Sequence, residues 1–374
     1  MIDSADIFKS LKRNKVDFFV GVPDSLLKHF SAYIEKKVLY DKHITAANEG
    51  NAVSIATGYH LATKKIPLVY LQNSGLGNCI NPLTSLTNKE VYSIPMLLLI
   101  GWRGEPGVKD EPQHLKQGSI LKDQLKLLNI KYYFINKKSN IKQLIDKAYK
   151  KTKESNLPVA LIVSKDTFKE NMYKTNKQIF NNNISRYESI KYITSKFKND
   201  LVVSTTGKTS RELFEIRKED GETCNDFLTI GSMGHASSIA LGVSLGQSKK
   251  GVVCIDGDGS LIMHLGSMAV IGTKRSRHFR HFLINNGCHD SVGGQISAGS
   301  EIDFCKIARA CGYSLVRKCR NLTQLSSAIK ESKNNNESSF IEIQVNKNSK
   351  ENLGRPNNTT YQNKFNFTKF VNKI

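Results

Sequence analysis

Short apolar runs alternate with longer segments of helical periodicity in both halves of the chain. The first half begins with an amphipathic segment at 4–14. Its apolar runs lie at 17–22, 68–72, 96–100, 132–135 and 159–163, and helix-like segments separate most of them. In the second half they lie at 201–204, 227–229, 252–255, 279–284, 314–316 and 340–345. Apolar runs of this length between helices are typical of strands that are buried on both faces of a parallel sheet. The pattern therefore predicts an α/β fold with two mostly parallel sheets, each with helices on both faces.

A polar stretch that is rich in Asn and Lys separates the two halves and has little apolar periodicity. We expect a linker at 169–187, between a first domain at 1–168 and a second domain at 188–374. A chain of 374 residues is long enough for two domains with substantial cores. The polar tail after Lys347 is expected to fray or to pair with a partner surface.

Charge and composition narrow the classes of partner. The net charge of +22 is compatible with nucleic-acid binding or with attraction of an anionic substrate. Lysines are spread evenly over the expected helix faces and loops, which favours a solvated surface and no nucleic-acid partner. The longest apolar run, at 94–100, contains Pro95 and is too short to span a bilayer, so no membrane association is expected. Seven cysteines without a Cys-x-x-Cys pair, and no secretory signal, indicate reduced thiols in a cytoplasmic protein.

Oxygen ligands follow two of the apolar runs in the second half. Gly-Asp-Gly at 257–259 comes after the run at 252–255, and Asn285 and Asn286 come after the run at 279–284. A helix-length spacer separates the two motifs, so adjacent parallel strands would bring both to the sheet edge where open α/β sheets bind ligands. The Asp258 carboxylate and the Asn286 amide oxygen suit Mg²⁺ that also holds phosphate oxygens. The alternative is two unrelated strand-end turns.

The two motifs together resemble the cofactor-binding signature of the thiamine-diphosphate-dependent decarboxylases. The resemblance covers nearly the whole chain outside the linker and tail, and further matching segments are those around Glu49, 58–59, 72–78 and 231–236. Four stretches resemble more narrowly the family members that act on 2-oxo acids carrying a phosphonate: 21–25, 101–107 with 110–114, 205–212 and 286–295. The resemblance implies a pyrimidine-binding first domain, a diphosphate-binding second domain, and the cofactors thiamine diphosphate and Mg²⁺.

The resemblance also implies roles for individual residues. The Mg²⁺ ligands are expected to be Asp258, Asn286 and the carbonyl of Cys288. Glu49, which begins a helix of small residues, is expected to hydrogen-bond the cofactor's pyrimidine ring, although a Glu stabilised by the helix dipole is the common alternative. The other cofactor-binding residues are expected to be Gln72, Asn73, Thr206, Gly207, Gly231, Ser232, Met233, Gly257, Gly259, Ser260 and Asn285, with Met233 under the bent cofactor.

The implied reaction is decarboxylation of a small anionic 2-oxo acid to an aldehyde. The expected catalytic residues are Glu49, His289, Asp24 and His114, and the expected substrate-binding residues are Arg103, His114, Lys208 and His289. Glu49 is expected to act at the cofactor of a neighbouring subunit, which predicts a homodimer or homotetramer with interfacial active sites. A sulfonate substrate and a carboligase reaction remain open, and so, in other classes, do a basic nucleic-acid-binding protein and an inactive protein of the same fold.

Overall fold

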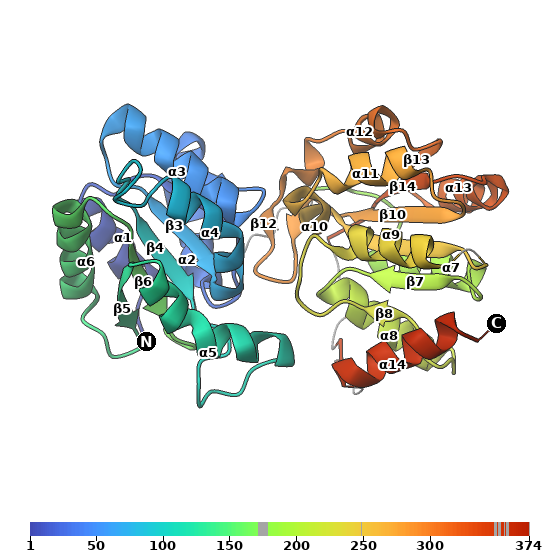
Figure 1. Cartoon of the computed structure of the whole chain (residues 1–374), viewed down its shortest axis with the longest axis horizontal. Coiled ribbons are helices and arrows are strands. Elements are labelled where there is room, and N and C mark those ends of the chain that lie inside the picture. The colour runs from blue at the N-terminus through green and yellow to red at the C-terminus, as the bar shows by residue number, and fades with distance from the viewer. Residues whose placement is uncertain are drawn as a thin grey trace. The chain divides into compact units, whose positions relative to one another are not determined.

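The computed structural model describes residues 1–170, 179–247, 249–347, 350, 353–354, 356 and 359–373 (Figure 1). Eight residues of the expected linker, 171–178, lie outside the described residues. No helix among the described residues is long and apolar enough to cross a membrane.

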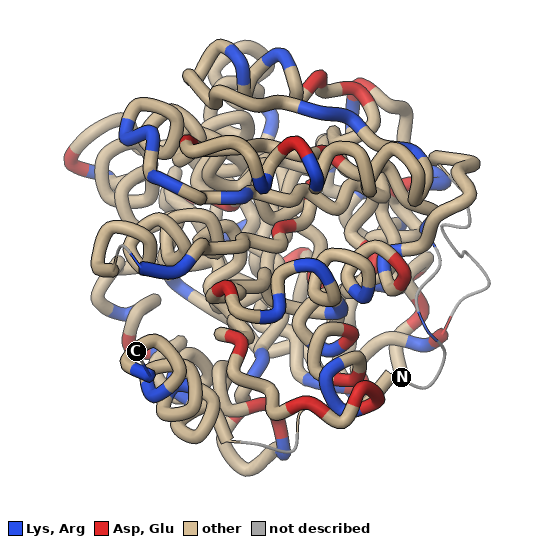
Figure 2. Tube along the Cα trace, turned by 90° about the vertical axis from the view of Figure 1, so that its right-hand side faces the viewer, with Lys and Arg blue, Asp and Glu red and all other residues tan. Residues whose placement is uncertain are grey.

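Charged residues are distributed along the whole described trace. Lys and Arg occur in many separate segments, and Asp and Glu lie among them (Figure 2). The charge of +22 is therefore spread over many elements and not confined to one stripe.

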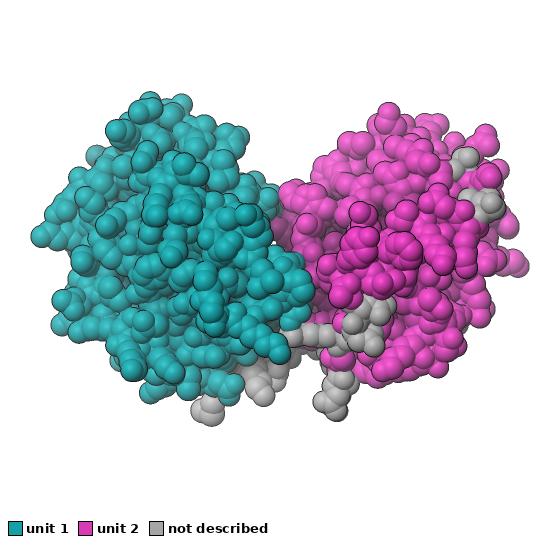
Figure 3. All heavy atoms as spheres, turned by 60° about the horizontal axis from the view of Figure 1, so that its bottom comes forward, with its two compact units in different colours: residues 1–176, 291–295 teal, residues 177–290, 296–374 magenta. Residues whose placement is uncertain are grey.

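The chain divides into two compact units (Figure 3). The first comprises Met1–Asn176 with Ser291–Gln295, and the second comprises Lys177–Asp290 with Ile296–Ile374. The helix that opens the second unit, α7 (Arg186–Lys196), begins where Ser185 and Glu188 form a reciprocal capping box. The segment expected as linker, 169–187, thus extends into the start of this helix.

The first unit contains a six-stranded parallel sheet with the strand order β2-β1-β3-β4-β6-β5. Its strands are β1 (Phe19–Gly21), β2 (His43–Thr45), β3 (Leu68–Gln72), β4 (Leu97–Gly101), β5 (Lys131–Ile135) and β6 (Val159–Val163). Its helices are α1 (Ser4–Arg13), α2 (Lys28–Lys37), α3 (Glu49–Thr63), α4 (Leu76–Ser85), α5 (Pro112–Leu127) and α6 (Ile141–Ser155), with short 3₁₀ turns η1 (Tyr40–Lys42) and η2 (Asn73–Gly75).

Alternating side chains of the first sheet enter two separate cores. Val69 and Leu71 of β3 lie in a core with residues of α3, α4 and α5. Leu68 and Tyr70 of the same strand lie in the opposite core, with residues of α1, α2 and α6. Because successive strand residues point to opposite faces, a strand buried on both sides is apolar throughout, which is why its run was visible in the sequence.

The second unit repeats this plan with the strand order β13-β14-β10-β9-β7-β8, again all parallel. Its strands are β7 (Leu201–Ser204), β8 (Phe227–Leu228), β9 (Val252–Gly257), β10 (Phe279–Asn285), β13 (Leu315–Cys319) and β14 (Ser339–Gln344); the short β11 (Cys288–His289), β12 (Gln295–Ile296) and η3 (Ala298–Ser300) follow β10. Helices α7, α8 (Lys208–Glu219) and α13 (Leu322–Asn334) pack on one face. The opposite core contains residues of α9 (Ala236–Gly246), α10 (Asp258–Met263), α11 (Ser267–Lys274), α12 (Phe304–Cys311) and α14 (Thr360–Val371).

The fold class predicted from the sequence is confirmed: both units have a parallel sheet with helices on both faces. The tail after Lys347 was expected to fray or to pair with a partner surface, and this was wrong in part, because residues 360–371 form helix α14. Phe367, Phe370 and Val371 join the second unit's core, so this segment packs against its own chain.

Candidate active site

Asp258 lies at the carboxyl end of β9, where the strand passes into α10. It is the first residue of that helix and is buried, with 2% of its surface exposed. The Ser297 hydroxyl and the backbone N–H of Asn286 hydrogen-bond to the carboxylate. Burial nevertheless raises the pKa of Asp258 to about 6. An anion held away from water in this way is stabilised by a cation, so the donor chemistry fits a divalent metal ion.

The two asparagines at the end of β10, Asn285 in the strand and Asn286 directly after it, play different roles. Both polar atoms of the Asn285 amide are used inside the unit, because Nδ2 donates to Gly299 O (2.8 Å) and Glu342 Oε1 (2.9 Å) while Oδ1 accepts from Gly287 N. The Asn286 Oδ1 accepts one bond, from Cys288 N at 3.2 Å, and an amide oxygen has two lone pairs. Asn286 therefore retains a lone pair for a metal, whereas Asn285 supports the turn.

Three turns of the second unit are tied together by side-chain hydrogen bonds. Thr205 donates to the Ser260 hydroxyl at 2.8 Å, and the same hydroxyl accepts from Gly234 N at 3.0 Å. Thr206, which precedes Gly207 at the start of α8, accepts from Gly231 N at 3.0 Å. The turns after β7, β8 and β9 thus meet at one edge of the sheet.

Gly259 lies beneath two of the expected site residues. A Cβ at Gly259 would lie 2.8 Å from Cε1 of His289 and 3.6 Å from Cε of Met233. Gly259 therefore makes room for the His289 ring, because a side chain at this position would collide with it. Ser232 next to Met233 has a φ of 44°, which makes the turn that carries Met233 a strained one. Burial lowers the pKa of His289 to about 4, so its imidazole is neutral near pH 7.

Lys208 belongs to a network of charged side chains. Its Nζ lies 3.0 Å from Oδ2 of Asp290, and Arg186 lies 3.3 Å from the same oxygen. Arg186 also makes a paired contact with the fully buried Glu212 at 2.8 and 3.0 Å. Lys208 is thus paired with an acid, and its ammonium group, which has three N–H donors, could contact a substrate anion as well.

In the first unit, Glu49 is the first residue of α3 and has 5% of its surface exposed. Asn78 Nδ2 donates to its Oε2 at 2.7 Å. A Cβ at Gly75 would lie 2.2 Å from its Oε1, so Gly75 makes the room that the carboxyl group occupies. Burial raises the pKa of Glu49, which favours the protonated form that can donate a hydrogen bond.

Asp24, a second buried acid of this unit, is hydrogen-bonded by the half-buried Gln72. Asp24 is fully buried, accepts from Gln72 Nε2 at 2.6 Å and from Leu26 N at 3.1 Å, and has a pKa raised by burial. His114, at the start of α5, is buried with its pKa lowered to about 4, and burial is the main cause. Its Nδ1 has no hydrogen-bond partner among the described residues.

Arg103 and Asn73 are engaged within the first unit. The Arg103 guanidinium pairs with both oxygens of Asp110 and donates to Ser25 Oγ at 2.8 Å. Asn73 is fully buried and pairs with the Arg103 backbone, accepting from N at 3.1 Å and donating to O at 2.8 Å. The arrangement gives both residues a clear role in holding the loop after β4, beside the binding roles expected from the sequence.

The structure adds residues that the sequence reasoning missed. Ser297 and Gly299 surround Asp258, where a Cβ at Gly299 would lie 2.5 Å from its Oδ2, and Asn78 and Gly75 surround Glu49. Ser297 caps the short 3₁₀ turn η3 and Gly299 lies within it, and a turn of three residues has no hydrophobic period by which the sequence could mark them. Asn78 and Gly75 were inside a matching segment, but only the fold shows what they contact.

Comparison with known proteins covers both units. The C-terminal TPP-binding domain of thiamine pyrophosphate enzymes matches residues 204–343, and the N-terminal TPP-binding domain matches residues 4–127. The chain is 32% identical to phosphonopyruvate decarboxylase of Streptomyces viridochromogenes over 99% of this chain and 95% of the relative. It is 30% identical to the protein of that name from Streptomyces hygroscopicus, over 95% of this chain and 90% of the relative. It is 26% identical to sulfopyruvate decarboxylase of Methanosarcina acetivorans, over 90% of this chain and 89% of the relative.

Proposed function

The chain belongs to the thiamine pyrophosphate enzymes and is a decarboxylase among them, and we propose that it converts 3-phosphonopyruvate to phosphonoacetaldehyde and carbon dioxide. The observation that carries the choice of substrate is the similarity to two phosphonopyruvate decarboxylases over nearly the full length of this chain. We place the product aldehyde in organic phosphonate biosynthesis, of the 2-aminoethylphosphonate type.

The cofactor is thiamine diphosphate, which when bound supplies an electron sink for the carbon–carbon bond that breaks as carbon dioxide leaves. Mg²⁺ would be held by Asp258, the Asn286 side chain and the Cys288 carbonyl, together with diphosphate oxygens. The backbone around Gly257 and Gly259, with Thr206, Gly207 and Ser260, would surround the diphosphate, and Met233 would support the cofactor. These assignments rest on the buried anion at Asp258 and the lone pair left at Asn286.

Glu49 would hold a proton at the pyrimidine ring of the cofactor. Its raised pKa supports this role, because a neutral carboxyl group can donate a hydrogen bond to a ring nitrogen whereas a carboxylate can only accept one. We propose that the two units of different subunits form each site, as a homodimer or a homotetramer.

The substrate carries a second anion, which needs hydrogen-bond donors. Arg103 and Lys208 are candidates because cationic donors form the stronger, charge-assisted bonds with an anion, and each has more N–H donors than one acid occupies. His289 and His114 are candidates because each imidazole, kept neutral by burial, still carries one N–H donor. Asp24 would orient a proton or line the cofactor pocket.

A sulfonate substrate is the second candidate, favoured by the similarity to a sulfopyruvate decarboxylase over 90% of this chain. The test is to incubate the purified protein with thiamine diphosphate, Mg²⁺ and either phosphonopyruvate or sulfopyruvate, and to measure the aldehyde formed. The proposal expects kcat/KM to be highest for phosphonopyruvate. Preference for sulfopyruvate would replace it with the second candidate, and equal turnover of pyruvate would mean that no site for a second anion exists.

A further inference from the structure

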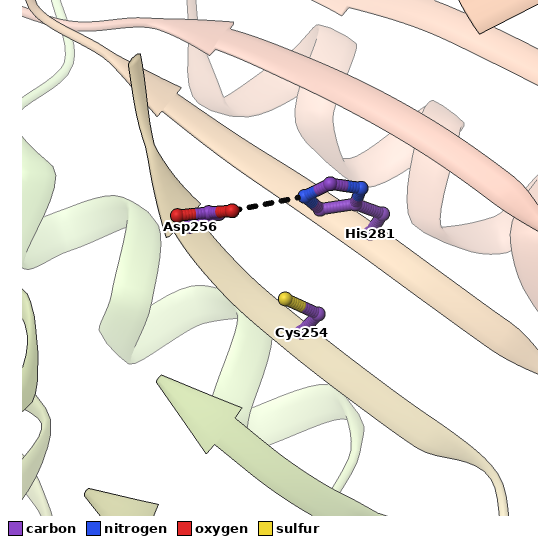
Figure 4. A group of neighbouring side chains, drawn as sticks. All are labelled: Cys254, Asp256 and His281. Carbon is purple, nitrogen blue, oxygen red and sulfur yellow. Dashed lines mark ion pairs between the residues drawn. The ribbon is translucent and has the colours of Figure 1, made fainter. Parts of the chain in front are cut away.

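Three metal-ligating side chains meet on one face of the second sheet (Figure 4). Cys254 and Asp256 are alternate residues of β9 and therefore point to the same side. His281, in the adjacent strand β10, pairs directly with Cys254 in the strand register. One ligand atom from each residue lies within 4.8 Å of the other two, and none of the three residues is exposed to solvent. The strand register thus builds the cluster.

Two polar atoms of this cluster are buried without a hydrogen bond from any described residue. They are Oδ2 of Asp256 and Nε2 of His281, which face each other at 3.5 Å. A charge-assisted hydrogen bond between a carboxylate and a protonated imidazole is typically about 2.7–2.9 Å long. The observed separation is wider, and the surroundings are apolar, including Phe279 and Phe340. A cation between the two atoms would satisfy both.

The chemistry of the three ligands identifies the class of ion. A thiolate, an imidazole nitrogen and a carboxylate oxygen together suit Zn²⁺, whereas Mg²⁺ prefers oxygen ligands alone. The other ring nitrogen of His281, Nδ1, lies 3.1 Å from the hydroxyl of the buried Tyr313, and such a second contact orients a metal-ligating imidazole. Burial raises the pKa of the Cys254 thiol, and coordination to a metal ion deprotonates a thiol outright.

We propose that Cys254, Asp256 and His281 bind one Zn²⁺ ion that joins β9 to β10. The same two strands lead directly into Asp258 and Asn286, so the ion would hold in register the strand ends that carry the Mg²⁺ ligands. The site does not depend on the substrate of the enzyme. Its occupancy can therefore be tested independently of decarboxylation.

The first test measures the zinc content of the full-length chain by elemental mass spectrometry. The protein is produced in medium supplemented with zinc. We expect about one zinc ion per chain in the wild type, reduced at least about tenfold in Cys254→Ala and in His281→Asn. Cys305→Ala is the matched control, since Cys305 is a buried cysteine of the same core, and it should keep the zinc. Asp258→Asn should also keep it. Zinc content that is the same in Cys254→Ala and the wild type would overturn the proposal.

The second test needs no substitution and so does not depend on the variants folding. Refolding the wild-type chain with Co²⁺ should produce the intense near-ultraviolet absorption of a thiolate bound to cobalt, and added Zn²⁺ should abolish that absorption. Wild-type protein that contains no zinc and gains no such absorption would show that Asp256 and His281 form a metal-free pair, and the proposal would fail.

Discussion

Burial of Glu49 favours the neutral acid and raises its pKa, although Asn78 donates to one carboxyl oxygen and this bond alone favours the carboxylate. Glu49→Gln keeps the shape of the side chain but removes the transferable proton. We expect kcat to fall by about 10²–10⁴, or roughly 3–5 kcal/mol in activation free energy. Steady-state rates at saturating thiamine diphosphate measure the loss. Glu90→Gln, at an exposed position of the same unit, is the control and should leave kcat unchanged. A Glu49→Gln enzyme with more than half of the wild-type rate would contradict the assigned role.

His43 predicts a pH dependence of stability. Burial lowers the pKa of His43 to about 4 from its ordinary 6.5, while Nε2 bonds the Tyr70 hydroxyl. The His43 imidazole therefore binds a proton more readily in the unfolded chain than in the folded one. Its contribution to the free energy of unfolding is complete above pH 6.5 and is lost as the pH falls towards 4. The lowering of about 2.5 corresponds to roughly 3 kcal/mol as an upper value.

His43→Gln tests this dependence. Between pH 6.5 and 4, urea unfolding should show that the variant loses less free energy of unfolding than the wild type does. The pKa values of His114 and His289 are also lowered to about 4, so the variant should retain part of the pH dependence. Identical slopes in the two proteins would mean that His43 titrates normally in the folded chain.

At the level of single residues, the sequence identified the groups with distinctive chemistry more easily than the groups that hold them. Asp258 was identified because it lies between glycines after one apolar run while Asn286 follows the next, and Glu49 because its segment resembles the pyrimidine-binding domain of the family. Ser297 is an ordinary serine until the fold brings it to the Asp258 carboxylate. The pairing of Arg103 with Asp110 likewise depends on the conformation of the loop after β4, which no hydrophobic period encodes.

At the level of elements, helix α14 covers the open edge of β8, which pairs only with β7 in the sheet order. The Asn363 side chain bonds the backbone groups that a further strand would otherwise bond at this edge. Its Oδ1 accepts from Leu228 N at 3.2 Å, and its Nδ2 donates to Asp226 O at 2.9 Å. Asn363→Ala should lower the free energy of unfolding by about 1–3 kcal/mol, because two buried backbone groups lose their partner. Urea unfolding measures the change.

Asn366→Ala is the matched control on the same helix, because Asn366 accepts a hydrogen bond from Gln362 in an exposed contact. It should change stability by less than about 0.5 kcal/mol. Equal effects of the two substitutions would mean that the edge of β8 gains nothing from Asn363. The helix was not predicted from the sequence because the stretch that precedes it, after Lys347, is polar, and the whole tail was interpreted from that composition.

At the level of the whole molecule, each unit has its own parallel sheet with a core on each face. The apolar runs predicted eleven of the twelve strands of the two sheets. The exception is β2, a three-residue strand that is only partly buried and carries no long apolar run. The strand orders did not follow from the apolar runs, because every parallel strand of this kind presents the same apolar surface to its neighbours. The inclusion of Ser291–Gln295 in the first unit also lay beyond the sequence, since no local pattern indicates it.

This organisation predicts that the chain can be divided into two folding parts. Fragments 1–170 and 179–374 each keep a complete six-stranded sheet, so each should unfold in one cooperative transition in urea, followed by circular dichroism. The first fragment lacks residues 291–295, which belong to the first unit. We expect this loss to leave its cooperative transition intact, because its sheet and both of its cores lie within 1–170.

The control is a cut between residues 264 and 265, which separates β9 from β10 at the centre of the second sheet. The fragment 265–374 should show no cooperative transition, because β10, β13 and β14 would be left without helices α7 and α9, which cover the two faces of the sheet. Loss of cooperative unfolding in both 1–170 and 179–374 would mean that each sheet needs the other unit to be stable.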